Sequence, residues 1–388
     1  MAAAPQIEVT SPAESASRFE PEFELLLACC RQQPDLSRLE LPAPNWGTVL
    51  GSAEHHRLIP ALYTALASLS HSSIHQIREA ARAHVWRALQ FTAELKRTAQ
   101  HLDRCGIPYL AYKGPALAQL LYGDVTMRQF GDLDFLVRTH DVPRARQALA
   151  ELGYEPELTL SPNQEQFYLR TGYEYPFRLG TERHVLELQW RIVPHFYSID
   201  LNIDALFQRS IQLEFEGIAI RTLGHEDLML VLCLHAAKHE WSQLGMLRDL
   251  ATLSKFDLDW RWITSAAARL GVLKILHISL LAVSELFGFG FHEACDPASR
   301  LRDAAEFTSQ LVQNLRRNRE ANTESLEYFL TQARMRERWR DRARFFWRLT
   351  TTPSIGEWEA IRLPRGLFGA YRAVRIARLT KRFSRVIF

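Results

Sequence analysis

Two aspartates separated by one apolar residue are the strongest chemical signal in the sequence. Asp132 and Asp134 flank Leu133 at the start of Asp-Leu-Asp-Phe-Leu-Val, a run typical of a buried strand. Side chains two positions apart on a strand point to the same face. Because like charges at that spacing repel and are costly to bury, the pair favours a bound cation. Oxygen ligands of this kind suit Mg²⁺ or Mn²⁺.

A second signal precedes the aspartates. A candidate strand at residues 107–112 leads into Lys113 and Gly114, and a helical run follows at residues 116–122. A strand that ends in Lys-Gly and enters a helix presents free backbone N–H groups and the positive end of the helix dipole, which favours phosphate. Each signal alone is common. Together with Arg128, four positions before Asp132, they form a more specific pattern.

The stretch from Tyr109 to Val137 resembles an uncharacterised family of nucleotidyltransferases within the polymerase-β-like superfamily. The resemblance rests on Lys-Gly, Leu-Tyr-Gly, a basic residue and the Asp-hydrophobic-Asp strand, and it extends over about residues 46–291. The superfamily commonly opens its helix with Gly-Ser or Gly-Gly. Here Gly114-Pro115 stands in that place, so a hydroxyl donor to phosphate is missing, although proline is acceptable in a first helical turn.

The resemblance implies a third carboxylate on a neighbouring strand, and Glu187 is the candidate. On the strand expected at residues 185–192, Glu187 and Gln189 share one face. The family often has histidine where this chain has Gln189, which forms hydrogen bonds but takes no proton near neutral pH. General-base work therefore falls to Glu187, or is left to a pKa lowered by the metal.

The implied reaction is an in-line attack on the α-phosphate of an NTP, with pyrophosphate as leaving group. Asp132, Asp134 and Glu187 are the expected catalytic and metal-binding residues of a two-metal site. The expected nucleotide-binding residues are Lys113, Gly114, Arg128, Lys238 and His239. A second interpretation of Arg128, given equal weight, is that it forms a structural ion pair with Asp132 or Asp134.

Two histidines on one downstream helix allow three interpretations. His235 and His239 are four residues apart, so both can face one ligand. They form a packed pair or bind a metal, or, as the resemblance implies, their helix closes over the nucleotide with Lys238 near phosphate. Asp249 is expected to anchor two helices, and the segment 55–57 (His-His-Arg) to serve the fold.

The pattern of elements predicts an α+β fold, in which a nucleotidyltransferase-type mixed sheet is flanked by N-terminal and C-terminal helical regions. Strands are expected at residues 107–112, 132–137, 173–179, 185–192 and 218–223. The predicted boundaries are a disordered tail at 1–20, a helical region at 21–104, the α/β core at 105–224, a helical domain closing over the site at 225–300, and a helical, strongly basic segment at 301–388.

Charge is unevenly distributed along the chain. Residues 331–388 carry 15 of the 47 Lys and Arg but 4 of the 44 Asp and Glu, so the preceding body is acidic. The basic segment is expected to contact this acidic body, an anionic membrane surface or nucleic acid. The start of the chain lacks the pattern of a signal peptide, and five scattered cysteines without CxxC spacing indicate a reducing, cytoplasmic compartment.

The sequence thus predicts a Mg²⁺-dependent enzyme that moves a nucleoside monophosphate from an NTP to a hydroxyl or phosphate. The acceptor is a small molecule, a peptide, a polysaccharide precursor or RNA. Two alternatives remain open: a toxin-like enzyme that modifies tRNA, and a catalytically idle nucleotidyltransferase fold that serves as a binding or regulatory module. Gly114-Pro115 and Gln189 favour the idle module.

Overall fold

The computed structural model describes residues 20–31, 44–67, 74–288, 301–353, 357, 361 and 363–387. The tail predicted at residues 1–20 lies outside these residues, except for Glu20. The N-terminal helices are α2 (Glu20–Cys29), α3 (Trp46–His55), α4 (Ile59–Leu66) and α5 (Ile74–Arg104). Asn45 caps α3 with its side chain, and Pro60 lies in the first turn of α4, where its missing N–H costs no helical hydrogen bond.

The chain then forms a mixed five-stranded sheet with the order β1-β2-β5-β4-β3. Its strands are β1 (Leu110–Ala111), β2 (Leu133–Leu136), β3 (Tyr154–Pro156), β4 (Glu174–Leu179) and β5 (Glu182–Gln189). A separate hairpin is formed by β6 (Ile211–Phe215) and β7 (Ile218–Thr222). The predicted α+β class with a mixed sheet is confirmed. The strands β3 and β6 were not among those predicted.

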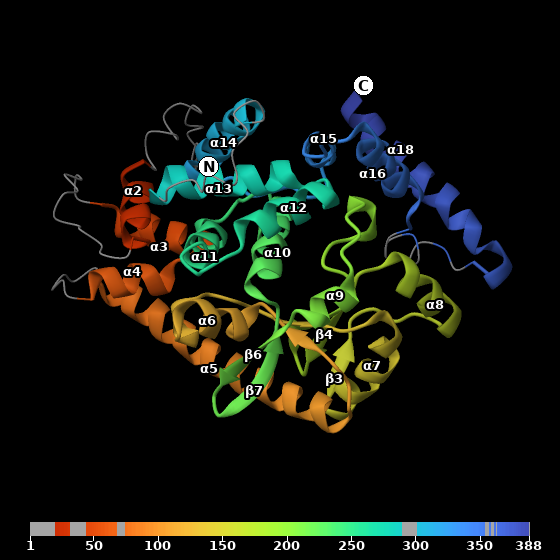
Figure 1. Ribbon diagram of the computed structural model, residues 1–388, viewed down its shortest axis with the longest axis horizontal. Helices are drawn as coiled ribbons and strands as arrows, with labels where there is room; N and C mark the ends of the chain where they lie inside the picture. The colour runs from red at the N-terminus through yellow and green to blue at the C-terminus, as the bar shows by residue number, and fades with distance from the viewer. Residues whose placement is uncertain are drawn as a thin grey trace, which may run out of the picture.

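Helices connect and cover these strands. Those within the α/β part are α6 (Gly114–Tyr122), α7 (Val142–Glu151), α8 (Pro162–Thr171) and α9 (Ile203–Gln208), with the short 3₁₀ turns η2 (Val125–Met127), η3 (Thr139–Asp141) and η4 (His195–Tyr197). In Figure 1, α5 runs along the lower edge of the molecule, and β3 and β4 lie above its right-hand part. Apolar residues of α5, α7 and the sheet form one buried cluster.

The C-terminal half is helical and lies across the top of Figure 1. Its elements are α10 (His225–Lys238), α11 (Leu244–Leu253), α12 (Trp260–Leu270), α13 (Leu273–Phe287), α14 (Leu301–Arg316), α15 (Leu326–Arg334), α16 (Trp339–Thr351), η6 (Arg365–Ala370) and α18 (Tyr371–Ile387). A second buried cluster joins these helices to α2, α3 and α4. Within the described parts of the chain, none of the helices combines the length and apolar composition that a membrane crossing requires.

The basic segment contacts the body through several arginines. Arg348 pairs with Asp200 at 3.0 Å, and Arg338 donates to the backbone oxygen of Ala268 at 2.7 Å. On the same helix, α16, Trp339 and Trp347 remain exposed. These contacts lie within the chain, and the three interpretations of the basic segment, which are docking on the body, a membrane surface and nucleic acid, stay predictions.

The turn between α3 and α4 joins the N-terminal helices to α11. His56 is fully buried, and its ring accepts a hydrogen bond from the backbone N–H of Leu244. Its backbone oxygen accepts a second hydrogen bond, from Gly245, at 3.0 Å. A Cβ at Gly245 would lie 2.9 Å from that oxygen, so the close approach requires glycine. The following residue, Arg57, adopts a positive φ of 57°.

Replacing His56 with glutamine should change how stability depends on pH. Burial lowers the pKa of His56 to about 3, whereas an unfolded histidine titrates near about 6.5. Between about pH 3 and about pH 6.5 the unfolded state therefore binds more protons than the folded state. The free energy of unfolding of the wild type decreases as the pH is lowered through this range, by up to about 1.4 kcal/mol per pH unit. Urea unfolding should show the wild-type advantage over His56→Gln shrinking by about 2 kcal/mol between about pH 7 and about pH 4.5. A constant difference would contradict this account.

Candidate active site

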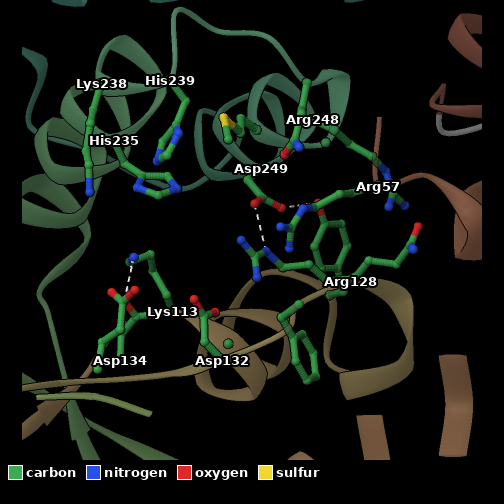
Figure 2. Close-up of a pocket in the computed structure, with 18 residues that line it drawn as sticks. Arg57, Lys113, Arg128, Asp132, Asp134, His235, Lys238, His239, Arg248 and Asp249 are labelled. Carbon is green, nitrogen blue, oxygen red and sulfur yellow. Dashed lines mark hydrogen bonds and ion pairs between the residues drawn. The ribbon is translucent and has the colours of Figure 1, made fainter. Parts of the chain in front are cut away.

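One cavity collects the residues that the sequence analysis selected. It lies between the sheet and helices α6, α10 and α11, and three groups of side chains line it (Figure 2). Acidic residues lie at the sheet, a histidine and lysine group comes from the end of α10, and arginines with Asp249 stand at the opposite end. Every predicted site residue lines this cavity: Lys113, Gly114, Arg128, Asp132, Asp134, Glu187, Lys238 and His239.

The three carboxylates come from two adjacent strands. β2 and β5 are parallel neighbours, and Asp134 is paired directly with Glu187. Residues paired across neighbouring strands point to the same face of a sheet. Asp132 immediately precedes β2 and lines the same cavity. The register therefore places Glu187 on the face of the aspartates, as the sequence analysis expects.

Gln189 holds two of these carboxylates together. Its side-chain nitrogen donates to Glu187 at 2.7 Å and to Asp134 at 3.1 Å. The Tyr112 hydroxyl donates to the oxygen of the same amide, which fixes the direction in which the amide points. Glu174, on β4, lies 3.5 Å from the Gln189 nitrogen and adds a fourth carboxylate to the group. Gln189 thus acts as a neutral bridge between acids.

Lys113 supplies the positive charge nearest to the carboxylates. Its ammonium lies 2.5 Å from Asp134 Oδ1. Burial acts against the charge of Lys113, but Asp134 and its neighbours outweigh burial and raise the pKa of the lysine well above its ordinary value. Burial raises the pKa of Asp134 to about 7 despite Lys113, and burial together with Glu174 raises the pKa of Glu187 to about 7. One lysine therefore leaves buried negative charge uncompensated.

The donor set fits a hard divalent cation. Carboxylate oxygens such as those of Asp132, Asp134 and Glu187 are ligands that Mg²⁺ and Mn²⁺ prefer. Asp134 Oδ2 is buried and has no hydrogen-bond partner, which leaves an oxygen that a cation would satisfy. The Lys113 ammonium and the Gln189 amide lie against the same carboxylates, so a metal ion would take over part of their contacts.

Gly114 opens α6 beside the aspartates. It adopts a φ of +56°, and a Cβ there would lie 2.9 Å from the backbone oxygen of Asp132. Both the backbone conformation and the close approach require glycine. Pro115 follows in the first turn and has no N–H to offer. The predicted glycine-opened start of a helix is therefore present, with one N–H donor fewer than a turn without proline, and its phosphate-binding role stays a prediction.

Arg128 pairs with a residue other than those predicted. The structural interpretation named Asp132 or Asp134 as its partner, but the Arg128 Nε donates to Asp249 at 2.8 Å. Asp249 also accepts a hydrogen bond from the Tyr122 hydroxyl at 2.8 Å. Because Tyr122 ends α6 and Asp249 lies on α11, the aspartate joins the two helices, in agreement with its expected role as an anchor.

The end of α10 covers the carboxylates from the other side of the cavity. Figure 2 shows His235, Lys238 and His239 above Lys113 and the aspartates. The sequence analysis predicts both histidines on one helix, but α10 ends at Lys238 and His239 lies just beyond it. Burial lowers the pKa of His235 well below its ordinary value and that of His239 to about 3, so both rings are neutral.

The two histidine rings pack edge to face with centroids 4.8 Å apart. Among the described residues, no third ligand completes a metal site around them. The two histidines therefore pack against each other and also face the cavity. A metal site at this pair is not supported.

Three residues of the site escaped the sequence analysis. Arg57 was assigned to the fold alone, yet it lines the cavity together with Arg248, whose guanidinium lies 4.6 Å from the centre of the Tyr122 ring. Glu174 joins the acids because it pairs with Gln189 across β4 and β5. The sequence does hold a pattern that could have identified Glu174. It alternates with the apolar Tyr175 on a predicted strand, which places the acid on one face of that strand. The arginines carry no such local signal.

A family model matches more than half of the chain. The model of a family described as an uncharacterised nucleotidyltransferase matches residues 42–288, which includes every residue lining the cavity. No curated protein and no solved structure matches the chain.

Alanine in place of Gly114 should be more destabilising than alanine in place of Gly106. Both glycines have positive φ, so both variants are expected to lose about 1–2 kcal/mol from backbone strain. At Gly106 a Cβ meets nothing within 4 Å, whereas at Gly114 it meets the Asp132 backbone. Urea unfolding of the two variants should therefore differ, by about 1 kcal/mol or more. Equal losses would show that α6 does not press on the Asp132 backbone.

Proposed function

We propose, from the premise that this chain belongs to the uncharacterised nucleotidyltransferase family, that it transfers a nucleoside monophosphate from an NTP to an acceptor hydroxyl and releases pyrophosphate. The observation that carries this proposal is the register that pairs Asp134 with Glu187 at the floor of a cavity with an arginine-rich far end. The acids suit a divalent metal ion, which would stabilise charge at the reacting phosphate, and the arginines suit the remaining phosphates.

In this reaction the acceptor oxygen forms a bond to the α-phosphorus, and the bond from that phosphorus to the bridging oxygen of pyrophosphate breaks. Glu187 takes the proton of the hydroxyl, because Gln189 beside it has no basic nitrogen. Arg57, Arg128 and Arg248 stand where negative charge of the leaving pyrophosphate would collect. His235 and His239 face the carboxylates across the cavity as neutral rings, so they add no positive charge there.

Asp132, Asp134 and Glu187 are the residues that would hold Mg²⁺ or Mn²⁺. The ion would supply charge stabilisation at the reacting phosphate and orient its oxygens. Asp249 takes no direct part. It fixes Arg128 and Tyr122, and so holds the arginine end of the cavity in place.

The idle binding module remains the second candidate, and one observation favours it. Lys113 already neutralises Asp134, and the Gln189 amide already bridges Asp134 and Glu187. A site of this kind can bind a nucleotide without a catalytic metal. The module predicts NTP binding that is independent of Mg²⁺ and of the aspartates, whereas the enzyme predicts dependence on both.

Replacing both aspartates should abolish transfer. Each α-labelled NTP is incubated with the protein, Mg²⁺ or Mn²⁺ and a lysate, and the labelled species and released pyrophosphate are measured. Asp132→Ala/Asp134→Ala is expected to lower the rate by about 1,000-fold, which corresponds to several kcal/mol of lost charge stabilisation. Asp204→Ala, at an exposed ion pair outside the cavity, serves as a matched control and should retain the wild-type rate. Equal rates in the double variant would refute the enzyme.

A further inference from the structure

A second cavity adjoins the first. The two share Lys238 and His239, and none of the arginines at the far end of the first cavity lines the second. Tyr173 lines the second cavity and receives a hydrogen bond from the Lys238 ammonium at 3.3 Å. Tyr173 also interacts with Glu174 and Glu187 of the carboxylate group. Figure 2 shows Lys238 above Asp134, at the end of the first cavity that lies opposite Arg57 and Arg248. The second cavity shares Lys238, so it adjoins the first at this end.

We infer that this second cavity receives the acceptor, and that the acceptor is a neutral compound whose hydroxyl is carried by a ring. The inference rests on the proposed function. An in-line displacement needs the attacking oxygen and the leaving pyrophosphate on opposite sides of the α-phosphate. Arginines stand at one end of the carboxylate group and an open cavity lies at the other, so donor and acceptor have separate places.

The chemistry of the second cavity explains the choice of a neutral ring. Aromatic side chains line it, among them Tyr173, Phe196 and Tyr328, and their faces favour planar or apolar rings. Two of its charged lining residues, Lys238 and Glu324, have opposite signs. Arg375 lies 3.4 Å from Glu357, and burial followed by Arg348 lowers the pKa of His195 to about 4, so that ring is neutral. A polyanionic acceptor would need uncompensated cations here.

One wall of this cavity lies beyond the family match. Tyr328, Thr352 and Arg375 follow residue 288, where the match ends. The Tyr328 hydroxyl donates to the backbone oxygen of Lys238 at 2.8 Å, so this wall is attached directly to the residues that the two cavities share. The matched part therefore supplies the transfer chemistry, and the segment that follows it selects the acceptor.

Filling the second cavity should impair acceptor use and leave NTP binding intact. Thr323→Trp and Thr352→Trp place a large side chain at its lining. Thr350→Trp, in the last turn of α16 just before Thr352, lines neither cavity and is the matched control. The full chain is incubated with α-labelled NTP, Mg²⁺ and, separately, the neutral low-mass, anionic low-mass, nucleic-acid and protein fractions of a lysate. Mg²⁺-dependent NTP binding is measured in parallel.

We expect label in the neutral low-mass fraction. The KM for that fraction should rise at least about tenfold in both filling variants and stay unchanged in Thr350→Trp. Label confined to the nucleic-acid, protein or anionic fraction, or filling variants with wild-type KM, would overturn the acceptor inference while leaving the transferase standing. Absence of label from every fraction, or NTP binding that ignores Mg²⁺ and the aspartates, would instead refute the proposed function on which the inference rests.

A separate cluster carries a second inference. His101 and Cys105 lie four residues apart at the end of α5, and Glu151 ends α7. The His101 ring nitrogen lies 3.0 Å from a Glu151 oxygen and 3.8 Å from the Cys105 sulfur, and all three ligand atoms lie within 4.8 Å of one another. A tetrahedral zinc ion holds such atoms about 3.3–3.6 Å apart. The observed distances bracket these values, and none of the three residues lines the catalytic cavity.

We propose that this cluster binds one Zn²⁺, or a similar divalent ion that accepts thiolate, and so fastens the end of α5 to the end of α7. Nitrogen and sulfur ligands distinguish this ion from the Mg²⁺ expected at the carboxylates. Water would complete the fourth position, because Glu151 is exposed.

Cobalt titration tests the cluster by its sulfur ligand. The Asp132→Ala/Asp134→Ala protein is used so that binding at the catalytic carboxylates does not contribute. One equivalent of Co²⁺ should produce the near-ultraviolet absorption of a cobalt–thiolate bond, and Zn²⁺ should displace it. Cys105→Ser and His101→Ala should lose this absorption, while Cys30→Ser, at a cysteine outside the cluster, should retain it. Absorption that persists in Cys105→Ser, or none in the parent protein, would refute the site.

Discussion

The constraint on which the site depends is the burial of several carboxylates on one face of two parallel strands. Asp134 and Glu187 are direct neighbours across β2 and β5, and repulsion between buried like charges must be offset for this pairing to persist. Lys113 offsets it with charge, and Gln189 with hydrogen bonds. Neither neutralises the whole group, and this uncompensated charge is the physical basis for proposing a divalent cation here.

The local backbone is adapted to this crowding. Gly114 permits α6 to begin against the Asp132 backbone, which brings the lysine that precedes the helix next to Asp134. The opposite end of α6 is held by Asp249 of α11 through Tyr122. A single short helix therefore links the acidic floor of the cavity to its arginine end. Displacement of α6 at either end would be transmitted to the charges at the other.

Sequence alone located the acids and the glycine-opened helix because both are local patterns. The Asp132-Leu133-Asp134 run fixes its own geometry through the period of a strand, and Gly114 marks a turn. The site features that the sequence does not predict depend on pairing between distant segments. The partner of Arg128 is 121 residues away on another helix, and Arg57 reaches the cavity only because His56 is bound to the start of α11. Strands as short as β3 leave too few residues for a period to show.

The position of Lys238 and His239 shows how the segment beyond the family match bears on the site. Where α10 ends, Glu240 and Trp241 both adopt positive φ, a conformation that costs free energy and persists only when its surroundings enforce it. Trp241 is fully buried and donates to Ser279 at 2.8 Å. The last carbonyls of α10 are satisfied from α15, where Gln332 donates to Ala237 and Tyr328 to Lys238. A helix C-terminus left without such donors frays. The C-terminal segment thus stabilises the end of α10, and with it Lys238 and His239, the two residues that line both cavities.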